Sequence, residues 1–295
     1  MIWYFFELIK VFTLFEVTSF HALLEELKVV RKDVQQLFEM IGQVDMAISV
    51  ASLRKSLPYY SLPNFIAPTK EINLAGIYHP LVTNCVANDL HLTNKSLLLT
   101  GSNMSGKSTF IKAVNLNIIA AQVLHTSFTK SYTAPFFKIA TSIRIQDDIT
   151  EETSYYRAEV ESIGNLIALS EQASPPYLFT IDEVFKGTNT IERISAAKAI
   201  LDYLTRDKLH LVLVSTHDIE LTQLLQDHFK LHYFQETIEN EVLSFDYKLK
   251  EGALQKRNAI NILALAGYPN SIIEEAKALS LEFEREKISG DFATD

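Results

Sequence analysis

Hydrophobic positions in the first part of the chain follow a helical repeat. Between residues 20 and 57 the apolar side chains alternate spacings of four and three positions, the heptad pattern of one long helix. The positions are Leu23, Leu27, Val30, Val34, Leu37, Ile41, Val44, Ile48 and Ala51. The pattern fits a helix packed on its own domain and, equally, a lever helix that joins two domains. Three prolines in "SLPYYSLPNFIAP", residues 56–68, break the helix and mark the clearest domain boundary.

From about residue 70, short apolar runs alternate with stretches of helical spacing. The runs "KSLLLTG" (95–101), "YLFTIDE" (177–183) and "HLVLVSTH" (210–217) predict buried strands. Helical spacing covers residues 107–124 and 192–204. Strands that alternate with helices predict an α/β fold with a mostly parallel sheet and right-handed crossovers.

The last part of the chain has a different pattern. Residues 232–252 alternate polar and apolar positions, which predicts additional antiparallel strands. Residues 258–287 have the spacing of two helices, broken at Gly267-Tyr268-Pro269. We therefore expect a C-terminal helical pair after the sheet.

The first 20 residues, "MIWYFFELIKVFTLFEVTSF", are rich in aromatic side chains but are interrupted by Glu7, Lys10 and Glu16. A membrane-spanning helix needs about 20 mostly apolar residues. We therefore expect an amphipathic segment that is buried or faces a partner rather than a membrane anchor. No signal-peptide cleavage pattern follows it. The N-terminal aromatic residues leave a membrane-tethered parent protein open, and the abrupt start in hydrophobic sequence leads us to expect part of a longer protein.

Composition and charge narrow the class of protein. Hydrophobic residues make up 47% and charged residues 21%, an ordinary globular balance. A net charge of −9 argues against a freestanding nucleic-acid-binding module, but not against an engine domain whose DNA contacts lie elsewhere. The single cysteine, Cys85, excludes an internal disulfide and a cysteine-rich metal site, so the cytoplasm is the simplest setting.

The segment "TGSNMSGKST", residues 100–109, contains the spacing G-x-x-x-x-G-K-[ST] between a predicted strand and a predicted helix. Backbone N–H groups of such a loop bind phosphate oxygens at the helix N-terminus. We expect Lys107 to reach the β- and γ-phosphates and Ser108 to bind Mg²⁺. The candidate nucleotide-binding residues are Gly101, Ser102, Asn103, Met104, Ser105, Gly106, Lys107, Ser108 and Thr109.

Two further strand ends carry candidate catalytic residues. Asp182 and Glu183 end the second buried strand, where Asp182 fits the Mg²⁺ shell and Glu183 fits the base that polarises the attacking water. His217 ends the third strand, where its ring can contact the γ-phosphate or that water. An Asp-Glu pair followed by a strand-end histidine resembles the P-loop ATPases of the ABC type. The base-reading motif N-K-x-D of GTPases is absent from the sequence, so ATP is favoured.

Several motifs together resemble the MutS mismatch-repair family, over about residues 20–285. The loop is similar to the family's T-G-x-N-M-x-G-K-S-T, with Asn103 and Met104 as its discriminating letters. "DEVFKGTNT" (182–190) resembles D-E-x-x-x-G-T-S-T, and "STHD" resembles T-H-Y or T-H-F. "IYHPL" (77–81) resembles the R-H-P that opens the ATPase domain, and residues 264–279 resemble A-G-x-P-x-x-V-I-x-x-A.

The resemblance implies an ATP-driven dimer switch coupled to DNA. Ser154 aligns with the family's serine that is presented to the ATP of the other subunit, and Glu159 with the glutamate of S-T-F-x-x-E. Asn103 would help to place the attacking water. The implied partners are a second copy, bound through the ATPase domains and the C-terminal element, and mismatched or otherwise distorted double-stranded DNA in the full assembly. ATP and Mg²⁺ are the implied cofactors.

The sequence also departs from the family's pattern. The phenylalanine of F-x-P-N-D, which stacks on adenine in the family, is replaced by Cys85 in "CVANDL". The signature reads S-Y-Y rather than S-T-F, and Asn189 replaces a serine. "FFE", residues 5–7, imitates the mismatch-reading F-x-E, but we interpret it as chance because the rest of that domain is missing from the sequence.

The expected organisation is a helical lever or core remnant over 1–60, an ATPase domain over 61–250, a dimerisation element over 251–285 and a tail over 286–295. Alternatives are the recombination-suppressing branch of the MutS family, for which no nuclease domain fits after residue 285, and an ABC-type engine with a non-DNA client. A transporter engine would show L-S-G-G-Q, which "DITEETSYY" does not resemble. A pure interaction protein with a dead site conflicts with the intact Lys107, Ser108, Asp182, Glu183 and His217.

Overall fold

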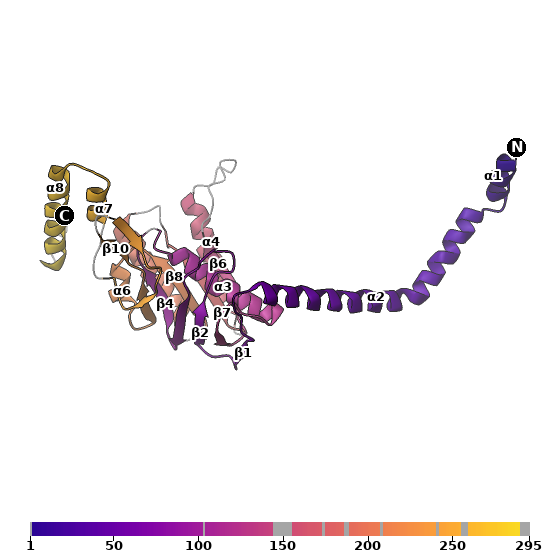
Figure 1. Cartoon of the computed structure of the whole chain (residues 1–295), viewed down its shortest axis with the longest axis horizontal. Helices are drawn as coiled ribbons and strands as arrows, with labels where there is room; N and C mark the ends of the chain where they lie inside the picture. The colour runs from indigo at the N-terminus through magenta and orange to yellow at the C-terminus, as the bar shows by residue number, and fades with distance from the viewer. Residues whose placement is uncertain are drawn as a thin grey trace. The chain divides into compact units, whose positions relative to one another are not determined.

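The computed structural model describes most of the chain (Figure 1). The described residues are 2–102, 104–143, 155–172, 175–185, 189–206, 209–239, 242–254 and 259–289. Asn103 and Ser154, two of the predicted site residues, lie outside these ranges, as do Gly187 and Thr188 of the "DEVFKGTNT" segment.

Two helices form the N-terminal part. Helix α1 (Ile2–Phe12) and helix α2 (Phe15–Ser56) are separated by a short turn in which Leu14 has a positive φ of 48°. Pro58 disfavours helical geometry at Leu57, which is extended, and α2 ends there. The helix that the heptad pattern predicts is therefore present as α2.

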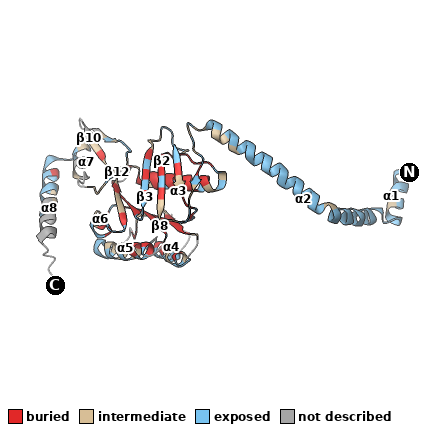
Figure 2. Ribbon diagram, turned by 90° about the horizontal axis from the view of Figure 1, so that it is seen from below, coloured by how far each residue is buried: buried red, intermediate tan, exposed pale blue. Residues whose placement is uncertain are grey.

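The heptad positions of α2 are exposed. The helix is described along its full length, and none of its residues is buried (Figure 2). Leu37 and Ile41, in the middle of the repeat, have 55% and 56% of their surface exposed. Within the described ranges, no helix combines the length and the apolar character needed to cross a membrane.

The larger sheet of the second unit is mixed and has six strands, in the order β12-β9-β4-β8-β7-β6. Each neighbouring pair from β9 to β6 is parallel, whereas β12 pairs with β9 in the antiparallel sense. The strands are β4 (Ser96–Thr100), β6 (Lys138–Ile143), β7 (Tyr177–Asp182), β8 (Leu211–Thr216), β9 (Phe229–Tyr233) and β12 (Lys250–Glu251). The α/β class predicted from the sequence is confirmed. Because Thr100 pairs with Thr216 and Asp182 with Ser215, the carboxyl ends of these strands meet at one edge.

Helices cover both faces of this sheet. Leu97 and Leu99 of β4 pack in a core with residues of α3 (Lys107–Leu124), whereas Leu98 packs in a second core on the opposite face. The second core includes side chains from α4 (Tyr155–Ser170) and α5 (Thr190–Thr205). A short helix, α6 (Glu220–Leu224), follows β8. The continuous apolar runs of β4, β7 and β8 reflect this burial on two sides.

A smaller four-stranded sheet lies on the α3 side, with the order β1-β5-β2-β3. Its strands are β1 (Asn64–Phe65), β5 (Ser131–Ala134), β2 (Glu71–Ile77) and β3 (Asn88–Thr93). In β3, buried and exposed residues alternate, so one face of the sheet packs on the core. The hydrophobic pattern does not predict this sheet, because its strands are short and partly polar.

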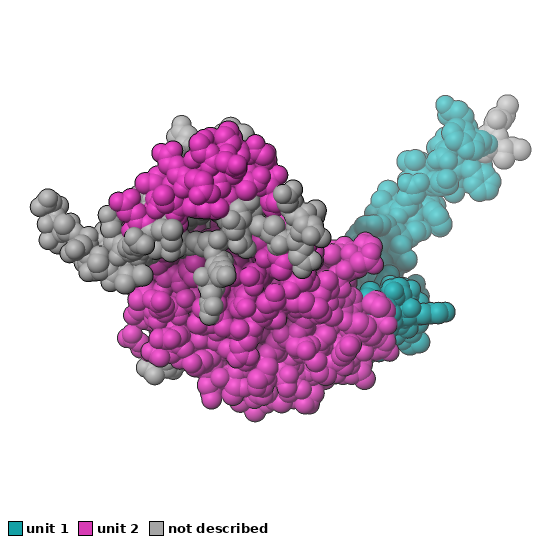
Figure 3. Space-filling model, turned by 60° about the vertical axis from the view of Figure 1, so that its left-hand side comes forward, with its two compact units in different colours: residues 1–57 teal, residues 58–295 magenta. Residues whose placement is uncertain are grey.

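Antiparallel strands and two helices complete the chain, as the pattern predicts. Strand β10 (Glu236–Glu239) pairs with β11 (Val242–Phe245) in a two-stranded sheet. Helices α7 (Ala259–Leu265) and α8 (Asn270–Ser289) flank Gly267, whose φ is 80°, and Pro269. The chain divides into two compact units, Met1–Leu57 and Pro58–Asp295 (Figure 3). The finer domain bounds given above stay predictions.

Candidate nucleotide-binding site

The glycine-rich loop connects β4 to α3 with a backbone that requires glycine. Gly101 has a φ of 148° and Gly106 a φ of 107°. A Cβ atom at Gly101 would lie 2.7 Å from the backbone oxygen of Phe234, so a larger residue does not fit there. The Ser105 hydroxyl donates a hydrogen bond to the Ser102 carbonyl at 2.8 Å, which closes the loop on itself.

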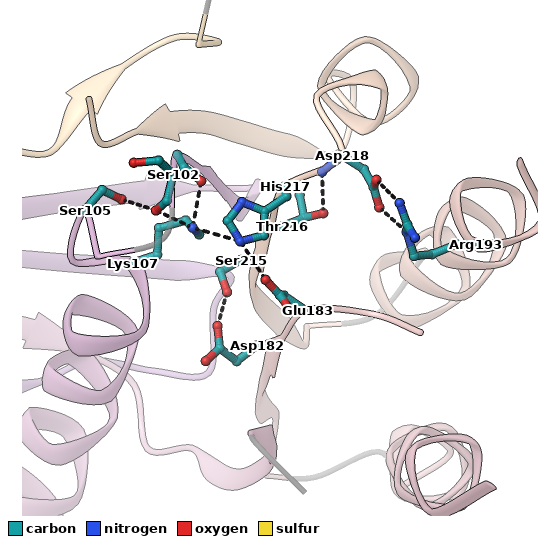
Figure 4. A network of polar contacts seen from close by, with 11 residues as sticks. Ser102, Ser105, Lys107, Asp182, Glu183, Arg193, Ser215, Thr216, His217 and Asp218 are labelled. Carbon is teal, nitrogen blue, oxygen red and sulfur yellow. Dashed lines mark hydrogen bonds and ion pairs between the residues drawn. The ribbon is translucent and has the colours of Figure 1, made fainter. Parts of the chain in front are cut away.

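Lys107, the first residue of α3, is buried, with 5% of its surface exposed. Its ammonium group turns back into the loop (Figure 4). Its Nζ atom donates to the carbonyl oxygens of Gly101 at 2.7 Å and Ser102 at 2.9 Å. The same Nζ atom lies 3.5 Å from Nε2 of His217. The cation therefore lies between the loop and the end of β8.

Asp182, the last residue of β7, is oriented by the neighbouring strand. The hydroxyl group of Ser215 in β8 donates a short hydrogen bond to its Oδ1 atom (Figure 4). The parallel register places these two residues side by side. Sequence reasoning missed Ser215; the available signal was a hydroxyl residue just before Thr216 and His217 in an otherwise apolar strand.

Glu183 follows in a sharp turn. Its φ is 68°, an unusual value for a residue with a side chain, and its N–H donates to the Ser215 carbonyl at 3.0 Å. One carboxylate oxygen, Oε1, lies 2.7 Å from Nε2 of His217 (Figure 4). The structure thus brings together Lys107, Glu183 and His217, which come from three separate motifs.

A buried glutamate links α4 to the same turn. Glu159 is 4% exposed, and its Oε1 atom accepts a hydrogen bond from the N–H of Phe185 at 2.5 Å. Phe185 also has a positive φ, 54°, and its ring lies 5.8 Å from the ring of Tyr156 on α4. The helix that begins just after Ser154 is therefore connected to the residues that follow Glu183.

A cavity of about 720 Å³, within the usual size range of ligand pockets, lies beside the loop and the end of β7. Six of the predicted nucleotide-binding residues line it, and so do Asp182 and Glu183. The six residues are Ser102, Met104, Gly106, Lys107, Ser108 and Thr109. Gly101 and Ser105 shape the loop behind this wall.

A further part of the cavity wall is formed by residues 82–86 and Tyr247. The side chain of Asn88 joins these parts, because it donates to the carbonyl oxygens of Val86 at 3.2 Å and Tyr247 at 2.9 Å. Cys85 is half-buried in this wall, while Tyr247 is 44% exposed. Tyr247 was missed by sequence reasoning, because nothing in the pattern connects residue 247 with the glycine-rich loop.

Tyr78 also lines the cavity, and its hydroxyl group donates to the carbonyl oxygen of Tyr59 at 2.8 Å. Burial raises the pKa of Tyr78 to about 12, with a further contribution from Tyr59, so this hydroxyl stays protonated near neutral pH. Tyr78 lies in the "IYHPL" segment, which is thereby held against residue 59.

A family model and several known proteins match the part of the chain that contains the glycine-rich loop and the strands beside it. A family model described as MutS domain V matches residues 97–284. A protein named DNA mismatch repair protein MutS from Fervidobacterium nodosum is 30% identical over 273 residues, covering 90% of this chain and 32% of that relative. The protein of the same name from Petrotoga mobilis is 30% identical over 285 residues, covering 86% of this chain and 34% of the relative.

A eukaryotic relative gives a similar match. The DNA mismatch repair protein MSH3 of Phaeosphaeria nodorum is 28% identical over 284 residues, covering 90% of this chain and 25% of the relative. The chain thus spans between a quarter and about a third of the length of these curated relatives.

Proposed function

The chain belongs to the MutS family, whose domain V it contains, and from this premise we propose that it binds ATP with Mg²⁺ and hydrolyses it. The observation that carries the proposal is the convergence of Lys107, Glu183 and His217 on one sheet edge. They belong to three motifs spread over more than a hundred residues, yet Nε2 of His217 lies 3.5 Å from Nζ of Lys107 and 2.7 Å from Oε1 of Glu183. The proposed engine is a P-loop ATPase of the ABC type.

Phosphate binding is assigned to the loop and to the start of α3. The N-terminus of a helix and the N–H groups of a glycine-rich loop favour negatively charged ligands. Lys107 is already directed toward the loop by its hydrogen bonds to Gly101 and Ser102, so it would reach the β- and γ-phosphates with little rearrangement. The adjoining nucleotide-binding residues would contribute backbone and hydroxyl donors.

The donor set fits Mg²⁺. Ser108 and Asp182 line the same cavity and offer a hydroxyl oxygen and a carboxylate oxygen, which are the hard ligands that Mg²⁺ prefers. When bound, Mg²⁺ would neutralise charge on the phosphate oxygens. The Ser215 hydroxyl would hold the Asp182 carboxylate in a fixed orientation for this role.

Water activation is assigned to Glu183 with His217. Glu183 would accept a proton from the attacking water. As it does so, the water oxygen would bond to the γ-phosphorus, and the bond between the γ-phosphorus and the oxygen that bridges to the β-phosphate would break. The 2.7 Å contact with His217 restricts the position of the carboxylate. His217, which also approaches Lys107, would contact the γ-phosphate or the water, with Asn103 as a further group that helps to place it.

Tyr247 is the residue that we propose for holding adenine. Cys85 stands where the family's loop has an aromatic ring, so a stacking surface for adenine has to come from another residue of the cavity wall. In the same part of the wall, Tyr247 offers a half-exposed ring fixed by its stacked contact with Phe245 and by the hydrogen bond from Asn88 to its backbone. Stacking on one aromatic face is worth on the order of 1 kcal/mol.

The wider mechanism is proposed from the family. Ser154 would contact the ATP of a second subunit, and ATP would hold two copies together through these domains until hydrolysis releases them. Glu159 supports this coupling, because it ties the helix after Ser154 to the turn that carries Glu183. The relatives are named as DNA mismatch repair proteins, so mismatched or distorted double-stranded DNA is the proposed partner of the full assembly. Helix α2 would be the lever that joins the ATPase domain to another domain of that assembly.

The test is steady-state ATP turnover of the chain with no DNA, matched duplex or mismatched duplex. Glu183→Gln should lower turnover by about 10²–10⁴-fold while ATP still binds, because a general base contributes that much. Glu161→Gln, at an exposed position on α4, is the matched control and should turn over normally. Unchanged turnover in Glu183→Gln would overturn the catalytic assignment. A DNA effect on the wild-type rate would support a DNA-coupled surface in this chain, and no effect would assign DNA sensing to other regions.

A further inference from the structure

A second charged pair lies beside the proposed catalytic groups. Nε of Arg193 donates to Oδ2 of Asp218 at 2.8 Å, and Nη2 donates to Oδ1 at 2.6 Å (Figure 4). The two side chains are only 21% and 11% exposed. Two parallel hydrogen bonds between a guanidinium and a carboxylate fix both position and orientation, unlike an exposed ion pair. The pair therefore makes a rigid connection between the elements that carry it.

The connected elements both lead to the proposed site. Arg193 lies in the first turn of α5, the helix that follows the "DEVFKGTNT" segment and begins at the Asn189 cap. Asp218 follows His217 directly. The N–H of Asp218 donates to the Thr216 hydroxyl at 3.0 Å, and its carbonyl accepts from Leu221 N–H in α6 at 3.2 Å. Asp218 is thus held by β8, α5 and α6 at once.

His217 depends on this arrangement for its position. Its side chain is 36% exposed, and its ring is in contact with Glu183 and Lys107 rather than enclosed by core residues. A small cavity of about 130 Å³ is lined by both pairs, Glu183 with His217 and Arg193 with Asp218, and by Val184 and Thr216. A movement of residue 218 would therefore move the histidine relative to the glutamate.

The charges are matched as well. The hydrogen bond with Asp218 raises the pKa of Arg193 above its ordinary value despite the opposing effect of burial, and the charges of Asp218, Glu183 and Glu220 add to the increase. Arg193 thus stays positively charged beside three carboxylates.

We propose that Arg193 and Asp218 are positioning residues that hold His217 against Glu183, and thereby set the rate of ATP hydrolysis rather than the affinity for ATP. The inference rests on the proposed function. It predicts that loss of either partner lowers kcat, because the hydrogen bond between His217 and Glu183 loses its fixed geometry. The hydrogen bonds that direct Lys107 into the loop go to the carbonyl oxygens of Gly101 and Ser102, so the affinity for ATP should be kept.

The experiment compares Arg193→Ala, Asp218→Ala and the exchanged double variant, Arg193→Asp with Asp218→Arg, by kcat and KM for ATP. Each single variant should lose about tenfold in kcat, within the range that small misplacements of reacting groups cost, with KM changed by less than about twofold. The exchanged variant should regain most of the loss. Lys198→Ala removes a different ion pair on the same helix, with Asp202 at 2.6 Å, and is the matched control with unchanged kcat.

A second measurement needs no turnover. The ring nitrogen signals of His217 in a ¹⁵N-labelled chain should shift in Arg193→Ala and stay unchanged in Lys198→Ala. Wild-type kcat and unshifted signals in a folded Arg193→Ala variant would overturn the inference. If the wild type itself does not hydrolyse ATP, the proposed function fails, while the ring signals still decide whether the pair positions His217. If a single variant does not fold, the exchanged variant decides by the same two readouts.

Discussion

Helix α2 and strand β4 are both built around apolar repeats, but their side chains meet different surroundings. Every residue of the five-residue strand β4 is buried, between α3 on one face and α4 with α5 on the other. None of the 42 residues of α2 is buried, although leucine, valine and isoleucine recur along it (Figure 2). A repeat thus determines which element forms, while burial depends on what packs against that element. Mutations that make the same chemical change in both regions can measure this difference.

The largest effect is expected in the sheet. Phe179 in β7 is fully buried, with its ring stacked on Tyr177 at 5.2 Å. Phe179→Ala should reduce the free energy of unfolding by about 3–5 kcal/mol, because it removes buried apolar surface and leaves a cavity. Urea unfolding followed by fluorescence measures this. A loss below about 1 kcal/mol would show that the sheet is packed far less tightly than its burial indicates.

An intermediate effect is expected where a helix meets the catalytic turn. Glu159→Ala leaves the N–H of Phe185 without its acceptor, which should cost about 1–3 kcal/mol in unfolding free energy and should also slow ATP turnover. Glu159→Gln keeps an acceptor oxygen and should cost less than Glu159→Ala. The same unfolding assay applies. Equal stability of the alanine and glutamine variants would contradict a role for this hydrogen bond.

The smallest effect is expected on α2. Phe38 is 72% exposed, so Phe38→Ala, the same change as at Phe179, should alter the unfolding free energy by less than about 0.5 kcal/mol. Gel filtration with the unfolding measurement checks whether the chain self-associates. A loss comparable to that of Phe179→Ala would break the comparison, because it would mean that α2 is packed in solution.

Local patterns were sufficient for the elements that carry the site. The apolar runs predict β4, β7 and β8, and the rule that parallel strands end at one edge predicts that Lys107, Asp182, Glu183 and His217 lie near one another. In the structure, Nζ of Lys107 and Oε1 of Glu183 both lie near the same ring atom, Nε2 of His217. The catalytic roles of these residues stay predictions until turnover is measured.

Contacts across the fold were not predictable in the same way. The hydrogen bond from Ser215 to Asp182 depends on the register of β7 and β8, and a shift of one residue would turn Ser215 to the other face. Arg193 and Asp218 are 25 positions apart and meet only because α5 packs beside β8. Tyr247 lines the cavity from the segment between the β10–β11 hairpin and β12. Such pairs follow from tertiary packing, which periodicity does not contain.

Ser215 serves the two acidic residues with different parts of itself, its hydroxyl group for Asp182 and its backbone carbonyl for Glu183. Point mutations replace side chains but leave backbone carbonyls in place. Every substitution at position 215 that preserves the strand therefore keeps the tie to Glu183, whereas only threonine among the strand-forming residues would retain a comparable hydroxyl for Asp182. Random substitutions at position 215 would therefore leave the position of the proposed base, Glu183, largely unchanged. The orientation of the proposed metal ligand, Asp182, depends on the side chain at this one position.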